Sequence, residues 1–581
     1  MRFNTSKKDV SATVNYEGAK AYTLTPELEL YSAVVTASLH DQFYEGSAER
    51  LERIRELIKK NDPQFVARLA VYAREKMYLR SIPLVLAVEL AKVHTGNGLV
   101  SNMVNRVVQR ADEITELLAF YTLSNERKET KKLHRLSKQI QKGLSLAFNK
   151  FDEYQFAKYN RAAAVTLKDA LFIVHPKPKD DDQQLLFDKI AQDELQVPYT
   201  WETTLTATGQ VQYSDASDRQ KAFRYAWEQL VESNMLGYMA LIRNLRNILQ
   251  ADVDNRIITK VCAQLSDEKA VLHSKQLPFR FLSAYRELKQ VKHKRRDDVL
   301  KALEAAIKIS VQHLQGFDQD TRVVIACDVS GSMQKAVSAR SVVRYYDIGL
   351  LLGMLLQHKC ENVVTGMFGD KWKVVDFPRK HILESVDAFY QREGEVGYST
   401  NGYLVLADLI KSGRIVDKVM MFTDCQMWDS TTGNQREKNT LAEQWKRYRS
   451  MAPEAKLYLF DLAGYGTTPV DVAAASRQHA TTAVESIRCT ESLGSSFEAF
   501  GAPSPQPRLA LTSRKSARRC RSCGGHRRGR IPAPSPSRSP PCRSRHTRAR
   551  SAWPPAGPPW SRRRSAPMPA GRAGRPPARP A

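Results

Sequence analysis

Three oxygen-bearing side chains stand on alternate residues directly after the apolar run VVIAC: Asp328, Ser330 and Ser332. Hard divalent cations prefer oxygen ligands, and a carboxylate with two hydroxyls on one turn supplies three while leaving room for water or a partner's carboxylate. Further oxygens should come from other strand ends, where Thr400 in GYSTNG and Asp424 after VMMFT stand in suitable places. The spacing therefore predicts a divalent-cation site, with Mg²⁺ as the expected ion.

Other roles of this turn remain open. Ser and Asp are also favoured at helix N-termini, so the same residues could act only as a cap at a strand-to-helix turn. If Asp328 accepted a phosphoryl group, a second Asp would be expected at the position of Ser330. A serine nucleophile would require a G-x-S-x-G elbow, which is absent here. The chain also lacks a P-loop motif. We therefore favour a metal site and predict that the protein is not an enzyme.

The elements that must hold this turn alternate between strands and helices after Gly316. Near-continuous apolar runs occur in RVVIACDVS, NVVTGMFGD, WKVVDF, DKVMMFTD and KLYLFDLAG, with helical segments such as SVVRYYDIGLLLGMLLQHK between them. Such runs indicate a parallel sheet covered on both faces. In a doubly wound sheet, ligands bind beyond the carboxyl ends of the strands near the switch point, and Asp328 stands at such an end.

The preceding chain is predicted to be helical from Pro26 to about Gln315. Apolar residues recur at helical spacing in ELELYSAVVTASLHDQFY, ERLERIRELIKK, QFVARLAVYAREKMY, IPLVLAVELAKVH and NMVNRVVQRADEITELLAFY. Breaks such as Asn61-Asp62-Pro63 separate these stretches. We predict an α-solenoid of paired helices, with a globular helical bundle as the alternative.

A basic stretch, ERKETKKLHRLSKQIQKG, lies in this helical region. At helical spacing its cations fall largely on one side, which suits a row of RNA phosphates, although exposed charges of this kind also serve solubility alone. Aromatic residues are not interleaved with them, so we expect recognition of backbone and shape with strong salt dependence. The residues of this stripe are Lys128, Lys131, Lys132, Arg135, Lys138 and Lys142.

Two further basic groups are weaker candidates for RNA binding. Arg243 and Arg246 stand at helical spacing with two asparagines in RNLRN, and we prefer a structural role in which they tie adjacent repeats together. A second cluster consists of Lys292, Lys294, Arg295 and Arg296.

The net charge of +27 is unevenly distributed. Residues 501–581 hold 20 Lys and Arg, no Asp or Glu and 17 of the 27 prolines, so the first 500 residues carry only about +7. Such a tail cannot bury a core, and we predict disorder.

The change of the tail's basic residues from a Lys and Arg mixture to almost pure Arg is typical of GC-rich DNA read out of frame. We hypothesise a frameshift after Val472 that removes the last sheet element of the α/β domain. Cys520, Cys523 and His526 have the spacing of one half of a zinc site, but no second pair of ligands accompanies them.

The compartment is predicted from what the chain lacks. No apolar run approaches the roughly 18 residues needed to span a bilayer, and the start MRFNTSKKDV has no apolar core of a signal peptide. The eight cysteines are mostly isolated, which fits reduced thiols better than a disulfide framework. We expect a cytoplasmic protein with no membrane association and no structural disulfides.

The pattern Asp-x-Ser-x-Ser, with a later Thr and a later Asp, resembles the metal-ion-dependent adhesion site of von Willebrand factor type A domains. The Gly-Gly that usually precedes the Thr is replaced here by Tyr398-Ser399. The ligand set that this resemblance implies is Asp328, Ser330, Ser332, Thr400 and Asp424.

The helical stretches resemble the Ro autoantigen family of TROVE-domain RNA-binding proteins, particularly its bacterial members. The likeness is carried by TPELELYSAVVTASLHDQFYE, LAVYAREKMYLRSIPLVLAVELAK, TLKDALFIVHPKPK, MLGYMALIRNLRNIL and LPFRFLSAYREL. Together with the type A domain it covers about residues 15–470. Because the surroundings of the family's HPKP region contact Y RNA, the resemblance implies Lys168, His175 and Lys177 as RNA contacts. His175 before a proline could equally be a turn residue.

The resemblance implies a multidomain protein in three parts. These are an all-α, HEAT-like helical-repeat ring (TROVE) at 1–318, an α/β doubly wound von Willebrand factor A-like domain at 319–500 and a disordered Arg/Pro-rich tail at 501–581. In this family a basic central hole takes 3′ ends of misfolded or immature RNA, and the outer face binds small non-coding Y-like RNA. Bacterial members tether an exoribonuclease such as polynucleotide phosphorylase. We expect a monomer. The alternative is a protein-binding type A module with a Mg²⁺-dependent site and no specific RNA role.

Overall fold

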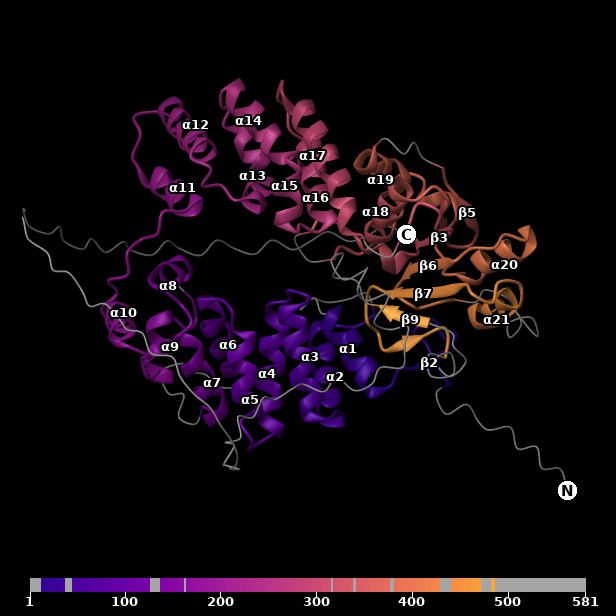
Figure 1. Ribbon diagram of the computed structural model, residues 1–581, viewed down its shortest axis with the longest axis horizontal. Coiled ribbons are helices and arrows are strands. Elements are labelled where there is room, and N and C mark those ends of the chain that lie inside the picture. Colours follow the sequence, from indigo (N-terminus) through magenta and orange to yellow (C-terminus); the bar gives the residue numbers. More distant parts are fainter. Residues whose placement is uncertain are drawn as a thin grey trace, which may run out of the picture. The chain divides into compact units, whose positions relative to one another are not determined.

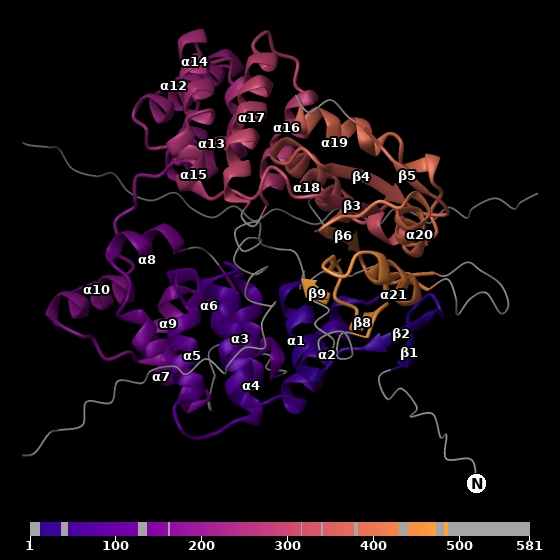
Figure 2. The ribbon, with the colours of Figure 1, turned by 45° about the vertical axis from the view of Figure 1, so that its right-hand side comes forward.

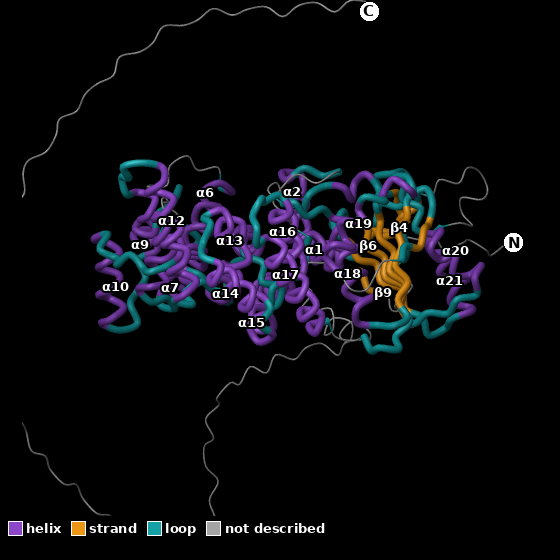
Figure 3. The backbone as a smooth tube through the Cα atoms, turned by 90° about the horizontal axis from the view of Figure 1, so that it is seen from above, coloured by secondary structure: helices purple, strands orange, loops and turns teal. Residues whose placement is uncertain are grey.

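The computed structural model describes residues 12–36, 44–125, 136–160, 163–314, 317–337, 341–376, 381–428, 440–471 and 482–485. The region from Pro26 to Ser310 is helical, two short strands precede it, and the other strands lie after it (Figures 1 and 3). The helices of the first region are α1 (Pro26–Val35), α2 (Ser47–Lys60), α3 (Pro63–Glu75), α4 (Ser81–Val93), α5 (Leu99–Val107), α6 (Ala111–Ser124), α7 (Lys138–Phe148), α8 (Glu153–Tyr159), α9 (Leu167–Val174), α10 (Asp181–Gln192), α11 (Trp201–Gln210), α12 (Ala216–Glu232), α13 (Tyr238–Gln250), α14 (Asn255–Leu265), α15 (Glu268–Ser274), α16 (Pro278–Lys289) and α17 (Arg296–Ser310).

Local sequence signals explain where many of these helices begin. At the predicted break before α3, the Asp62 side chain accepts a hydrogen bond from the Gln64 N–H at 3.1 Å, and Pro63 takes the first helical position. A capping oxygen satisfies one otherwise unpaired N–H, and proline has no N–H to lose there. α1 begins in the same way at Thr25 and Pro26. The predicted helical character of this region is confirmed.

One predicted stretch divides into two helices. The periodicity of NMVNRVVQRADEITELLAFY runs without a break, yet α5 ends at Val107 and α6 begins at Ala111. The buried Glu113 carboxylate accepts hydrogen bonds from the N–H groups of Gln109 and Arg110 at 2.8 and 3.1 Å and pairs with Arg74 at 2.8 Å. A charged cap held by a distant arginine therefore starts a new helix where apolar spacing alone shows none.

The α/β domain contains one six-stranded sheet with the strand order β5-β4-β3-β6-β7-β9. All neighbours are parallel except the edge strand β5, which pairs antiparallel with β4. Numbered within the domain, the order is 3-2-1-4-5-6, the doubly wound order in which the switch point lies at the first strand, here β3. The strands are β3 (Val323–Asp328), β4 (Val363–Phe368), β5 (Trp372–Val374), β6 (Lys418–Thr423), β7 (Lys456–Asp461) and β9 (Thr482–Glu485).

Helices cover both faces of this sheet, as the apolar runs predict (Figure 1). Alternate strand residues divide between the faces: Ile325 packs with α18 and α19, whereas Val324 packs with α20 and α21. Burial on both sides is the reason that every residue of β3 is apolar up to Asp328. The helices are α18 (Tyr345–Lys359), α19 (Ile382–Tyr390), α20 (Tyr403–Ser412) and α21 (Leu441–Met451), with short 3₁₀ turns at Val311–His313, Gly331–Gln334 and Glu393–Glu395.

β9 lies where the sequence offers only one weak candidate for a last strand. It pairs in parallel with β7, with Leu457 opposite Thr482. The sheet element that the frameshift hypothesis would remove is thus present as a four-residue strand. The proposed tail, residues 501–581, and its cysteine and histidine group lie outside the described residues.

A second, antiparallel sheet was not predicted. It has the order β1-β2-β8 and joins β1 (Ala12–Val14) and β2 (Lys20–Thr23) to β8 (Thr467–Thr468), with Tyr22 opposite Thr468 (Figure 2). Strands of two to four residues carry too little periodicity to recognise, and the pairing joins segments more than four hundred residues apart. This sheet attaches the start of the chain to the α/β domain.

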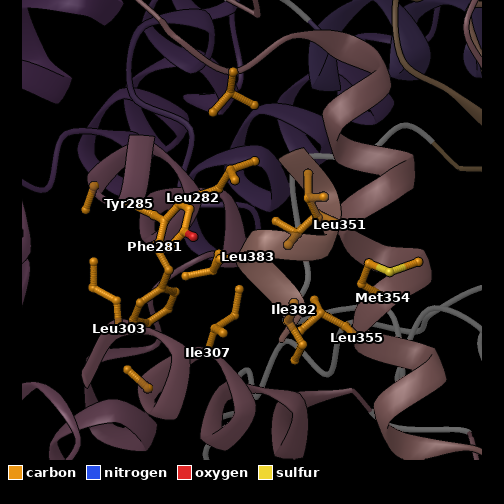
Figure 4. Packing of buried hydrophobic residues seen from close by; sticks show 14 of the residues in the cluster. Phe281, Leu282, Tyr285, Leu303, Ile307, Leu351, Met354, Leu355, Ile382 and Leu383 are labelled. Carbon is orange, nitrogen blue, oxygen red and sulfur yellow. The ribbon is translucent and has the colours of Figure 1, made fainter. Parts of the chain in front are cut away.

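The other end of the helical region is attached by apolar packing and by a buried carboxylate. Side chains of α16 and α17 lie against those of α18 and α19 in one continuous core (Figure 4). Glu304 of α17 accepts hydrogen bonds from the N–H groups of Ile382 and Leu383 at 3.0 and 2.7 Å and of Glu384 at 3.1 Å. Glu304 thus caps α19, whose own N-cap His381 makes no side-chain hydrogen bond.

Two further features concern the hydropathy of the described helices and the state of the described cysteines. Among them, no helix combines the length and the apolar character needed to cross a bilayer. The four described cysteines, Cys262, Cys327, Cys360 and Cys425, are free thiols.

Candidate functional site

The first two strands of the site meet at Asp328 and Thr423, the last residues of β3 and β6. These strands are parallel neighbours with Cys327 opposite Phe422, so their final residues lie side by side. The Thr423 hydroxyl donates a hydrogen bond to Asp328 Oδ2 at 2.6 Å, and the Ser330 N–H donates to Oδ1 at 2.9 Å. Both carboxylate oxygens of Asp328 are therefore oriented by neighbours. Thr423 was missed by the sequence prediction, although it directly precedes a predicted ligand.

The two predicted serines lie together on the turn that follows β3. Their Oγ atoms are 3.3 Å apart, and both side chains are buried. Ser332 belongs to a short 3₁₀ turn, Gly331–Gln334, and not to the first turn of an α-helix. The capping alternative is therefore weakened, because neither serine makes a side-chain cap to α18, which begins only at Tyr345.

Asp424 has one satisfied and one unsatisfied oxygen. Its Oδ1 accepts a hydrogen bond from the Gln426 N–H at 3.0 Å, whereas Oδ2 is buried and has no described donor within good hydrogen-bond geometry. The Ser332 hydroxyl lies close enough to the carboxylate to favour its charged form and so lower its pKa, against the effect of burial. The turn is tight, because Cys425 adopts a left-handed conformation with φ of 62°. A buried carboxylate oxygen without a donor is costly unless a cation or water satisfies it.

The loop that carries Thr400 lies against the segment after Asp424. The Trp428 N–H donates to the Thr400 carbonyl at 3.0 Å, and the Asn401 N–H donates to the Gly369 carbonyl at 3.2 Å. Tyr398-Ser399 replaces the usual Gly-Gly without opening the loop, since the Ser399 N–H is held by Asp370 at 3.2 Å. The structure therefore brings the strand ends and loops of all five predicted ligands to one edge of the sheet.

Electrostatics distinguish the two candidate ligand carboxylates from ordinary surface acids. Burial raises the pKa of Asp328, and burial together with the nearby Asp328 charge raises the pKa of Asp424. The third acid at this edge, Asp461, is already satisfied by the Ser32 hydroxyl at 2.8 Å and by two backbone N–H groups. Two buried like charges with an unpaired oxygen fit a divalent cation, which would offset their repulsion.

The donor set is one of hydroxyls and carboxylates. Within the described ranges, no group of three or more His, Cys, Asp or Glu side chains is arranged to hold a metal. The candidate site therefore depends on Ser330, Ser332 and Thr400 as well as on its two carboxylates. Such an all-oxygen set favours Mg²⁺ or Ca²⁺ over zinc.

The predicted basic stripe is only partly within the described residues. Lys128, Lys131, Lys132 and Arg135 lie outside them. α7 begins at Lys138 with Ser137 as its N-cap, so the single helix predicted through the whole basic stretch is wrong at residues 136–137, which are not helical. Lys138 and Lys142 lie one turn apart on α7 and are exposed, and Lys138 contacts Gln141 at 3.2 Å.

The loop after α9 runs along α7 and adds to these two lysines. Gln141 Nε2 donates to the Val174 carbonyl at 3.1 Å near one end of α7, and Asn149 Nδ2 donates to the Lys177 carbonyl at 2.8 Å near the other. The side chains of His175 and Lys177 are exposed on this loop, as is that of Lys179, which the sequence prediction missed. We call Lys138, Lys142, His175, Lys177 and Lys179 the α7 basic surface.

Two residues of the HPKP region differ in role. His175 is the left-handed C-cap of α9, with φ of 49° and its N–H donating to the Leu171 carbonyl at 2.9 Å, so it is a turn residue with an exposed ring. Lys168 lies in the first turn of α9, at the opposite end from His175, and pairs with Asp193 at 2.7 Å. Lys168 is therefore not part of the α7 basic surface.

Three of the other six basic candidates form ion pairs with described residues, whereas Arg243, Lys292 and Lys294 are exposed. Arg246 of α13 pairs with Glu287 of α16 at 2.8 Å, which agrees with the structural role preferred for RNLRN, whereas Arg243 is exposed. Arg295 pairs with Asp298, and Arg296 pairs with Asp297 at 2.9 Å.

Comparisons with known proteins agree with this architecture. A family model described as "TROVE domain" matches residues 32–225 and 193–319. "Telomerase protein component 1" of Mus musculus is 25% identical over 290 residues, and that of Rattus norvegicus is 24% identical over 293 residues. Each match covers 39% of this chain and only 11% of the relative. The solved structure "Crystal structure of Deinococcus radiodurans RO (RSR) protein" is similar with a TM-score of 0.54 at 16% identity, over 82% of this chain and 99% of that chain.

Proposed function

Because this chain belongs to the TROVE-domain family and is Ro-like, we propose that it is an RNA-binding protein of the Ro type. The family match covers the helical region that carries the α7 basic surface. Clustered cations without carboxylate partners are the usual electrostatic footprint for phosphates.

The proposed ligands are those of the Ro type. The α7 basic surface would bind the backbone of a small non-coding Y-like RNA, and a central hole would take 3′ ends of misfolded or precursor RNA. The chain would act as a cytoplasmic monomer in RNA quality control or processing. It would catalyse no reaction itself and would depend on a nuclease partner, for example an exoribonuclease such as polynucleotide phosphorylase.

One observation carries the RNA proposal within the structure. The two contacts from Gln141 and Asn149 hold the loop 175–179 along the whole of α7. Four lysines and one histidine from two separated segments are thereby exposed on adjoining elements. A preformed surface of this kind binds backbone phosphates with little dependence on sequence.

The test is RNA binding by the full chain across a salt series. The triple variant Lys138→Ala, Lys142→Ala, Lys177→Ala should show a salt slope smaller by about 2 and bind a structured RNA roughly a hundredfold more weakly near 0.1 M salt. A matched variant removes three exposed lysines elsewhere: Lys221→Ala, Lys269→Ala, Lys411→Ala. Equal losses in both variants would mean that binding follows total charge and would reject this surface.

The Arg-rich tail requires its own comparison, since 19 arginines bind RNA without a fold. A chain ended at Phe500 should keep its affinity and prefer an RNA with a single-stranded 3′ extension. Loss of binding with the tail would assign the RNA affinity to the tail.

For the α/β domain we propose a von Willebrand factor A-like identity with Mg²⁺ bound by Asp328, Ser330, Ser332, Thr400 and Asp424. The unpaired Asp424 Oδ2 and the switch-point position support this. Mg²⁺ would supply positive charge to two buried carboxylates and hold their loops together. A second function, Mg²⁺-dependent binding of an acidic protein partner, would use the same site. In that case Asp424→Asn would abolish binding of the acidic protein and leave the affinity for RNA unchanged.

A further inference from the structure

The candidate cation site is closed to the outside. Its five predicted ligands expose between 0 and 6% of their surface. A site that offers its cation to an external carboxylate needs an open face. We propose that the turn between β1 and β2, together with Tyr44, is an internal latch that covers this face, and that a cation bound at the site holds the latch closed. This inference rests on the proposed cation site.

The turn between β1 and β2 is fastened to the segment that follows Asp424. Asn15 Nδ2 donates a hydrogen bond to the Met427 carbonyl at 2.7 Å, and this contact is buried. The Tyr16 N–H donates to Gln426 Oε1 at 3.0 Å. The Gln426 N–H itself donates a hydrogen bond to Asp424 Oδ1, so a single residue, Gln426, connects the latch to a predicted ligand.

The second part of the latch is a cluster of three tyrosine rings. Tyr44 stacks on Tyr16 with ring centroids 5.3 Å apart and meets Tyr465 edge-on at 5.4 Å. The Tyr44 N–H donates to the Tyr465 hydroxyl at 3.3 Å. These contacts join the segment before α2 both to the β1–β2 turn and to the loop that follows the carboxyl end of β7.

Tyr44 also joins the latch to the site itself. Its hydroxyl donates a hydrogen bond to the Glu17 carboxylate. Burial, with Glu17 and the Asp424 charge acting in the same direction, raises the pKa of Tyr44, and a hydrogen bond with Ser332 acts against them. Tyr44 therefore lies between Glu17 on one side and two predicted ligands, Ser332 and Asp424, on the other.

The charges give the sign of the coupling. Glu17 itself is exposed, but its hydrogen bond to Tyr44 places a negative charge beside the tyrosine that neighbours Ser332 and Asp424, and like charges repel. A divalent cation reverses the sign of the site and attracts Glu17. By linkage, the free energy by which the bound cation stabilises the closed latch equals the free energy by which closure strengthens cation binding.

The consequence concerns the partner of the site. In the closed arrangement the cation's open face is occupied by this chain's own N-terminal segment. An external acidic partner would have to displace the latch first. The segment 12–23 thus acts as the intramolecular occupant of the cation site.

The test is hydrogen exchange of the full chain with and without Mg²⁺, beside calorimetric titration with Mg²⁺. At Mg²⁺ concentrations about ten times the dissociation constant, exchange in residues 12–23 should slow by about tenfold. Glu17→Gln should remove most of this slowing, and Tyr44→Phe, which keeps the ring and removes the hydroxyl, should reduce it. The matched control Glu27→Gln removes an exposed acid from the start of α1 and should leave it unchanged.

The outcomes separate the two proposals. If Mg²⁺ binds and Asp424→Asn abolishes binding, but residues 12–23 exchange at the same rate with and without Mg²⁺, the latch is wrong and the cation site stands. If Mg²⁺ titrates the unaltered chain no better than it titrates Asp424→Asn, the cation site fails, and the latch fails with it. Mg²⁺-dependent slowing that Glu17→Gln removes and Glu27→Gln keeps supports both.

Discussion

Glu304 gives the sharpest test of how the helical region is attached to the α/β domain. Its carboxylate accepts three backbone hydrogen bonds, at 2.7 to 3.1 Å, from the first turn of α19, and its side chain is almost fully buried. Glu304→Ala would leave the N–H groups of Ile382 and Leu383 without a partner in a buried place. Each unsatisfied buried group costs about 1–3 kcal/mol, so we expect α19 to lose about 3 kcal/mol after relief of the carboxylate's own desolvation.

The assay must report on α19 locally, because a chain with several cores need not unfold in one step. A loss of about 3 kcal/mol should speed amide exchange in Ile382–Tyr390 by roughly a hundredfold. Glu304→Gln keeps one acceptor oxygen and should lose about half as much free energy. Glu384→Ala removes an exposed acid from the same first turn and should cost only about 0.5 kcal/mol. If Glu304→Ala changes exchange no more than Glu384→Ala does, the capping argument is refuted.

Three further predictions concern the site and its surroundings. Metal-free protein should lose stability as pH rises above the ordinary carboxyl range, because the raised pKa of Asp424 means that the folded state disfavours its ionisation. Asp424→Asn should make the stability less dependent on pH, and Mg²⁺ should oppose the loss. Thermal melting across a pH series measures all three effects. Gly464→Ala should destabilise by about 2–3 kcal/mol, since a Cβ there would meet Thr36, the C-cap of α1, whereas Gly413→Ala, also left-handed but open, should cost about 1 kcal/mol, both measured by urea unfolding. Glu113→Ala should cost about 3 kcal/mol and fray the start of α6, which exchange in residues 109–116 would detect.

Several expectations followed correctly from the sequence because their physical causes are local. A helix shows its buried side at a spacing of three or four residues, and a strand covered on both faces shows an unbroken apolar run. These signals predicted the helices from Pro26 onward and the strands β3, β4, β6 and β7. The position of Asp328 at a strand end needed only the sharp change from apolar to polar residues.

The basic stripe shows where such reasoning is limited. Helical spacing cannot say which lysines keep their charge free for a ligand, because partners come from other helices. Lys168 pairs with Asp193, and Arg246 pairs with Glu287, both across more than twenty residues of chain. By contrast, the loop 175–179 is held beside Lys138 and Lys142 by hydrogen bonds from Gln141 and Asn149, which no sequence pattern predicts.

The sequence by itself determined the helical region, the doubly wound sheet and the oxygen-bearing side chains at its strand ends, since each follows from the spacing of neighbouring residues. Only the tertiary structure decided that Asp461 is already satisfied by Ser32 and that the β1–β2 turn is hydrogen-bonded to the segment after Asp424. Those contacts join residues about four hundred positions apart. Such pairings depend on the packing of the whole chain, and one sequence contains no local signal for them.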